Sequence, residues 1–180
     1  GLVSILHMLR FNDTNILMLR IILIILMIAV SVVARLLPHL ANVAPIGALA
    51  LFAGVYLPKK WAFIIPIVAM LVSDLFLGFY TLPVMLLVYV SFLAMVGIGT
   101  LVKKTMSCEA NGKAWINIGL GALSGSIIFF IATNFGVWAF TNLYPHNIAG
   151  LLSAYTMGLP FFKWTVIGDL AWSVAFFGGY

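Results

Sequence analysis

Four ionisable side chains lie inside stretches of the chain that are otherwise apolar enough to cross a lipid bilayer. They are Arg35, Asp74, Lys163 and Asp169. A charge in the hydrocarbon region costs about 2.5–3.5 kcal/mol on insertion scales, so such residues normally face a bundle interior, a partner or a wet cavity. Buried charges of both signs can bind a polar solute, join helices as ion pairs, or act as acid and base. These four residues are therefore the first candidates for function.

Each of the four also has a purely structural interpretation. The long side chains of Arg35 and Lys163 can reach a headgroup region, because their charged ends lie far from the backbone. Asp74 and Asp169 are too short for this, so their structural role would be an ion pair or a hydrogen bond to a neighbouring helix. The pairs Arg35 with Asp74 and Lys163 with Asp169 are the natural candidates. The sequence alone leaves the structural and functional interpretations open.

The composition indicates the class of protein that positions these residues. Of the 180 residues, 64% are hydrophobic and only 7% are charged, with a net charge of +5. Soluble domains carry about 25% charged residues, so lipid must cover much of this surface. The Lys and Arg residues are scattered between apolar runs and form no basic face, which argues against nucleic acid as a partner.

The apolar runs predict an all-α, polytopic membrane helix bundle with about six transmembrane helices, at about 20 residues per span. The expected spans are 17–37, 40–57, 61–79, 82–102, 114–140 and 159–177. The second is short and contains Pro45, so a short or partly re-entrant helix is the alternative there. We expect residues 1–16 to form an N-terminal interfacial segment and 17–180 a single transmembrane domain. Residues 148–158 are expected to form a cap or interfacial helix.

The basic residues outside the apolar cores predict the orientation of the bundle. They are Arg10, Arg20, Lys59, Lys60, Lys103, Lys104 and Lys113. All of them fall on one side of the predicted spans, whereas the connections at 38–42, 80–83 and 141–147 contain no Lys or Arg. The positive-inside rule therefore predicts that both termini are cytoplasmic.

Polar and aromatic side chains gather toward the opposite, outer end. At about 1.5 Å per helical residue, Asp74 and Arg35 fall in the outer half, and Asp169 lies deepest. Asn134 is also toward the outside. Aromatic residues at that end include Phe79, Tyr80, Trp138, Phe140, Tyr144, Tyr155, Phe161, Phe162 and Trp164. An interfacial aromatic belt with an interhelical Asn is one interpretation, and an outward-facing pocket with aromatic walls is the other.

Small residues predict close helix contacts. Gly47, Ala50, Ala53 and Gly54 form one stripe, and Gly121 with Gly125 begins another. Packing inside the chain is favoured over docking of a second subunit.

Catalytic signatures are absent from the sequence. It contains no phosphate loop G-x-x-x-x-G-K-[ST], no H-E-x-x-H and no G-x-S-x-G motif. His39 and His146 are isolated in predicted connections. We therefore expect no catalytic residues, no metal and no cofactor, and the chain is not expected to be an enzyme. An intramembrane enzyme that uses the aspartates as acid and base is a further alternative.

Four segments of the chain carry a resemblance to a known group of proteins. They are residues 42–52 (NVAPIGALALF), 70–80 (MLVSDLFLGFY), 133–138 (TNFGVW) with Tyr144-Pro145, and 159–170 (LPFFKWTVIGDL). From about residue 36 onward the chain resembles an uncharacterised bacterial six-helix membrane family. That family is in turn similar to the substrate-binding S components of energy-coupling factor (ECF) vitamin transporters.

This resemblance implies a function in solute capture. S components bind their ligand in an outward-facing pocket under outer loops, and transport needs a transmembrane coupling subunit and ATPases. The resemblance thus implies a subunit of the bacterial inner (cytoplasmic) membrane that contacts lipid and binds a small, vitamin-like, zwitterionic or ring-bearing metabolite. The expected ligand-binding residues are Arg35, Asp74, Asn134, Trp138, Lys163 and Asp169.

The first predicted helix departs from the S components at the position where they dock to the coupling subunit. S components generally carry an Ala-x-x-x-Ala docking motif on their first helix, but residues 21–28 here are bulky, and Ala29 and Ala34 are spaced differently. The alternative function is a non-catalytic structural or accessory subunit of a larger membrane complex.

Overall fold

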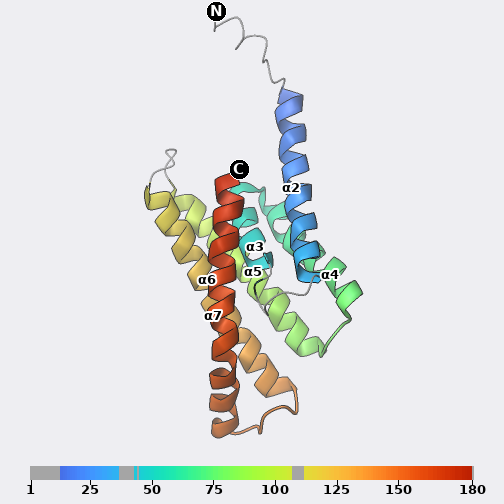
Figure 1. Ribbon diagram of the computed structural model, residues 1–180, viewed down its shortest axis with the longest axis vertical. Coiled ribbons are helices and arrows are strands. Elements are labelled where there is room, and N and C mark those ends of the chain that lie inside the picture. Colours follow the sequence, from blue (N-terminus) through green and yellow to red (C-terminus); the bar gives the residue numbers. More distant parts are fainter. Residues whose placement is uncertain (1–12, 37–42, 44, 107–111, 180) are drawn as a thin grey trace, which may run out of the picture.

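The computed structural model describes residues 13–36, 43, 45–106 and 112–179, and the fold of these residues is all-α (Figure 1). Their helices are α2 (Asp13–Leu36), α3 (Ile46–Tyr56), α4 (Lys59–Leu77), α5 (Leu82–Thr105), α6 (Gly112–Phe140) and α7 (Ile148–Gly179). Within these ranges, α4, α5 and α6 are long and apolar enough to cross a membrane, by length and composition. The predicted all-α class is confirmed, and the three apolar helices are compatible with a multi-pass membrane protein.

Helix α3 differs from the expected span at 40–57. It has 11 residues, which corresponds to about 16 Å and falls well short of a hydrocarbon core of about 30 Å. Every residue from Ile46 to Val55 is buried. A helix that is apolar on all sides can be buried in a bundle as well as in lipid, and here the apolar run forms an internal helix.

Helix α7 contains two elements that were predicted as separate from the sequence. The expected cap at 148–158 and the expected span at 159–177 form one continuous helix of 32 residues, with Pro160 inside it. A proline removes one helical hydrogen bond, but α7 packs along α6 and the helix continues. Of the expected N-terminal segment 1–16, residues 1–12 lie outside the described residues, and 13–16 belong to α2.

The internal helix α3 organises the bundle, because it contacts each of α2, α4, α5, α6 and α7. Its backbone lies directly against that of α5. A Cβ atom on Gly54 would overlap the carbonyl oxygen of Val96, and one on Gly99 would overlap that of Leu51. These contacts confirm that the small residues of α3 serve packing inside the chain.

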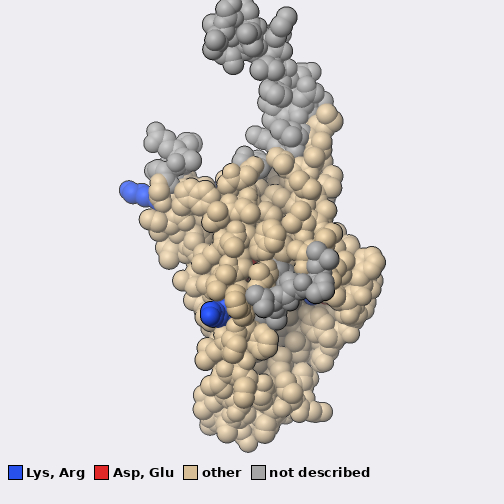
Figure 2. Space-filling view, in the orientation of Figure 1, with Lys and Arg blue, Asp and Glu red and all other residues tan. Residues whose placement is uncertain are grey.

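Several helix termini gather toward two opposite ends of the molecule. The start of α2, the end of α5, the start of α6 and the end of α7 lie toward one end, and the α6–α7 connection lies at the other (Figure 1). The surface between them is poor in charge: the face in Figure 2 shows isolated basic groups on an otherwise uncharged surface.

Candidate functional site

The structure joins Arg35 of α2 to Asp74 of α4 in an ion pair. Arg35 Nη1 lies 2.7 Å from Asp74 Oδ1, and the two side chains are 18% and 1% exposed. Tyr89 of α5 donates a hydrogen bond of 2.8 Å to Asp74 Oδ2, and Arg35 also donates to Ser73 Oγ. Each oxygen of the Asp74 carboxylate thus faces a donor, as an ionised carboxylate requires. The predicted Arg35–Asp74 pair is confirmed.

The other suggested pair, Lys163 with Asp169, does not form in the described part of the chain. Six positions separate them on α7, which turns them about 120° apart around the helix axis. Lys163 is therefore exposed, with its Nζ 5.4 Å from the ring centroid of Trp164. Asp169 is only 4% exposed and lies 2.7 Å from the hydroxyl of Ser126 on α6.

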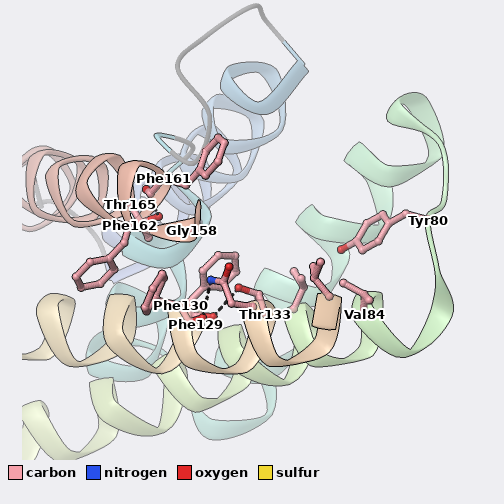
Figure 3. A pocket seen from close by; sticks show the side chains of 12 residues that line it. Tyr80, Val84, Phe129, Phe130, Thr133, Gly158, Phe161, Phe162 and Thr165 are labelled. Atoms are coloured by element: carbon pink, nitrogen blue, oxygen red, sulfur yellow. Dashed lines mark hydrogen bonds between the residues drawn. The ribbon is translucent and has the colours of Figure 1, made fainter. Parts of the chain in front are cut away.

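A cavity of about 260 Å³ lies among α5, α6 and α7 (Figure 3). Its lining residues on α6 and most of those on α7 lie in the halves of these helices that are nearer to the α6–α7 connection. It is lined by Tyr80, Val84, Val88, Phe129, Phe130, Thr133, Asn134, Val137, Gly158, Phe161, Phe162 and Thr165. Figure 3 shows rings from α6 and α7 on one side and Tyr80, from the α4–α5 connection, on the other. The ring centroids of Phe130 and Phe162 are 4.8 Å apart, so the wall is a packed aromatic surface.

Asn134 supplies a polar side chain to this cavity. Its Nδ2 donates a hydrogen bond of 2.8 Å to the carbonyl oxygen of Phe130 in the preceding turn. Its Oδ1 lies against α7 at Gly158, where an added Cβ would overlap it. The hydroxyls of Thr133 and Thr165 each donate to the carbonyl of their own helix four residues earlier. These residues provide hydrogen-bonding groups without a formal charge.

Tyr80 links the cavity to the buried ion pair. Burial, together with the negative charge of Asp74, raises the pKa of Tyr80 to about 12. Its phenol therefore stays protonated at neutral pH and can donate a hydrogen bond toward the cavity. Among the twelve lining residues, none is Asp, Glu, Lys, Arg or His.

The six predicted ligand-binding residues thus occupy five different environments. Asn134 lines the cavity, Arg35 and Asp74 pair with each other, Asp169 is buried on the far side of α7 from Lys163, and Lys163 is exposed. The indole Nε1 of Trp138 donates a bond of 3.0 Å to the carbonyl oxygen of Pro145. Trp138 therefore fastens the α6–α7 connection and does not line the cavity.

Sequence reasoning missed part of the cavity wall. Phe129 and Phe130 precede Thr133 and Asn134 by four residues each, and Val137 continues the same face. This i, i+4 spacing on α6 was a usable signal. By contrast, nothing in the sequence indicated that Val84 and Val88 of α5 close the other side.

Metal binding finds no support in the described residues, which contain no group of three or more His, Cys, Asp or Glu side chains that could hold an ion. His39 lies outside the described residues. The ring Nε2 of His146 lies 3.1 Å from the carbonyl oxygen of Thr141, within the α6–α7 connection.

Fold and site together define an all-α helical protein with an aromatic-walled cavity and apolar helices compatible with membrane insertion. The family model described as "Family of unknown function (DUF6580)" matches residues 15–180. The chain belongs to this family. Searches of the curated proteins and of the solved structures found no match.

Proposed function

We propose that this chain is a membrane-embedded binding subunit for a small, uncharged, ring-bearing metabolite, similar in role to the S components of ECF vitamin transporters. The observation that carries the proposal is the cavity among α5, α6 and α7, which combines aromatic walls with the amide of Asn134. Ligand sites typically combine apolar and aromatic walls with a few polar groups that fix orientation.

The size of the cavity supports a small ligand. Its volume of about 260 Å³ is slightly below the range of about 300–1,000 Å³ that is usual for ligand pockets. A molecule with one ring, or two small fused rings, is the class that suits this space. Phe129, Phe130 and Phe162 offer ring faces and edges for such a molecule.

The lining also supports an uncharged ligand. The sequence suggested a zwitterionic or ring-bearing metabolite held by four charges, but the cavity lining contains none of them. A charged group placed there would lose its hydration without gaining a counter-charge. Asn134, the two threonines and Tyr80 suit the amide, carbonyl or hydroxyl groups of a neutral ring compound.

The predicted topology determines which side of the membrane the cavity faces. If the lysine-bearing connections face the cytoplasm, the α6–α7 connection and the cavity near it face outward. In this proposal the chain spans the bacterial cytoplasmic membrane, captures solute from outside, and needs a transmembrane coupling subunit and ATPases for uptake. The exposed side chains of Ile22, Ile25 and Leu26 on α2 would contact lipid or that subunit.

Native mass spectrometry of gently purified protein tests the proposal with two matched variants on α5. Val88 lines the cavity, whereas Val90 is 57% exposed. We expect a small-molecule adduct on the wild type, its loss in Val88→Phe because the larger ring fills the cavity, and its retention in Val90→Phe. A wild-type protein without any solute adduct, or an adduct that Val88→Phe retains, contradicts the proposal.

The same spectra address the alternative of a non-catalytic accessory subunit. The Arg35–Asp74 pair supports that alternative, because these two charges join α2 to α4 and do not line the cavity. An accessory subunit would retain protein partners and no solute, and its partners would survive the Val88→Phe substitution.

A further inference from the structure

The hydroxyl of Ser126 lies between two oxygen atoms. Its Oγ is 2.7 Å from Asp169 Oδ2 and 3.0 Å from the carbonyl oxygen of Ala122. A hydroxyl has one hydrogen, and both a carbonyl and an ionised carboxylate can only accept. If Asp169 were ionised, a single hydrogen would have to serve two acceptors.

A proton on Asp169 satisfies both contacts. The protonated Oδ2 donates to Ser126 Oγ, and Ser126 in turn donates to the carbonyl oxygen of Ala122. We propose that Asp169 is a proton-binding site that holds its proton in the folded protein. The site lies where α7 meets α6, and α3 closes it, because an added Cβ on Gly47 would overlap Asp169 Oδ1.

The surroundings of Asp169 contain no described counter-charge. The other titratable side chains of the helices around it are Tyr56 on α3, Tyr89, Lys103 and Lys104 on α5, Lys113 on α6, and Tyr155 and Lys163 on α7. Among the described residues, no basic side chain lies within ion-pair distance of Asp169. Lys113, for example, is about 20 Å along α6 from Ser126. A buried carboxylate without a partner is strongly disfavoured relative to its neutral form.

Asp74 provides an internal comparison. Its two oxygens face Arg35 and the Tyr89 hydroxyl, which are both donors to an ionised carboxylate. Asp169 has instead a neutral neighbour, Ser126, whose single hydroxyl hydrogen also faces the carbonyl oxygen of Ala122. The two buried aspartates thus differ in their partners: Asp74 has a guanidinium and a phenol, whereas Asp169 has only a hydroxyl among the described side chains.

The proton site is close to the cavity along the chain. Thr165, which lines the cavity, precedes Asp169 by four residues and so lies one turn away on the same side of α7. Loss of the proton would place an uncompensated negative charge where α3, α6 and α7 meet, one turn of α7 away from the cavity residue Thr165. The inference goes beyond the proposed function, because it requires no ligand.

Infrared spectroscopy of the purified protein at neutral pH tests it. A protonated carboxyl shows a carbonyl stretching band that a carboxylate lacks, and the chain has only four Asp and Glu side chains in total. We expect this band in the wild type, its loss in Asp169→Asn, a shifted band in Ser126→Ala because a hydrogen bond is lost, and no change in Asp13→Asn.

The melting temperature of Asp169→Asn shows whether the band is lost because the carboxyl group is removed or because the variant unfolds. The Asn amide can donate to Ser126 as the protonated acid does, so the variant should keep the wild-type melting temperature. Absence of the band from the wild type, or a band that stays unchanged in Asp169→Asn or in Ser126→Ala, would overturn the proposal. None of these readouts depends on a bound solute, so they separate the proton site from the proposed function.

Discussion

At the residue scale, the acidic and basic side chains that the structure describes divide into an ion pair, a buried acid without a charged partner, and exposed lysines. Arg35 and Asp74 join α2 to α4, and Tyr89 adds α5 to the same cluster. Both pairs were suggested from the sequence because buried charges normally have a partner of opposite sign. Lys163 and Asp169 do not pair because the six positions between them on α7 turn them about 120° apart around the helix axis.

Removing one partner of the Arg35–Asp74 pair should destabilise the fold more than removing both. Asp74→Leu or Arg35→Met leaves an uncompensated charge, and breaking a buried pair typically costs about 3–5 kcal/mol. The double variant should cost clearly less than the sum of the single ones. Thermal unfolding of the four proteins in the same detergent measures this, and additive effects would show that the pair contributes no coupling.

The phenol of Tyr80 should ionise only at strongly alkaline pH. Its pKa is raised to about 12 by burial and by the charge of Asp74, whereas the unfolded chain has a tyrosine pKa of about 10. Unfolding therefore releases this proton between these values, and the stability that Tyr80 contributes is lost as pH rises from about 10 to about 12. The difference in tyrosinate absorbance between wild type and Tyr80→Phe reports the titration. A difference curve centred near the ordinary tyrosine pKa would contradict the partial desolvation of this phenol and its proximity to Asp74.

At the element scale, the internal helix α3 is the feature that the sequence could not distinguish from a membrane span. Its residues are apolar on every side, as lipid or a protein core would both require. The helix is buried because the glycines Gly54 and Gly99 allow α3 and α5 to approach to backbone contact. The length of α7 was also missed, since residues 148–158 were expected to form a separate cap or interfacial helix, whereas they continue into 159–177 as one helix packed on α6.

Two glycines on α5 offer a matched test of this contact. A Cβ on Gly99 would overlap the carbonyl oxygen of Leu51, whereas one on Gly97 would meet nothing within 4 Å. Gly99→Ala should therefore destabilise the protein by about 1–3 kcal/mol, the range for overpacked cores. Gly97→Ala should be neutral or should stabilise by up to about 1 kcal/mol, through better helix propensity. Melting temperatures of the two variants decide this, and equal values would contradict the close α3–α5 approach.

At the scale of the whole molecule, composition indicated an all-α bundle that the structure confirms, and the helix order of the described residues follows the apolar runs closely. The site was harder to predict. Asn134 and several aromatic residues of α6 and α7 were recognised, but the cavity also needs Val84 and Val88, whose role depends on which helices are neighbours. Such neighbour relations depend on tertiary packing, which local spacing does not encode.

Orientation in the membrane is a prediction at this same scale. His146 lies in the α6–α7 connection and Lys104 lies in the last turn of α5. Each can be replaced by a single cysteine, His146→Cys or Lys104→Cys, in a protein whose own cysteine is removed by Cys108→Ser. With the lysine-rich end inside, a membrane-impermeant maleimide should label the His146→Cys protein in intact cells and the Lys104→Cys protein only after permeabilisation. The reverse pattern would place the cavity on the cytoplasmic side and exclude solute capture from outside.

In the proposed function, the cavity among α5, α6 and α7 holds a small ring compound. An experimental structure of the protein purified from its native membrane, in lipid nanodiscs, would show whether the cavity is occupied. We predict density for a compact, planar molecule against Phe130 and Phe162, within hydrogen-bonding distance of Asn134. A cavity that contains only water, or a lipid acyl chain that enters it from the membrane, would contradict the claim.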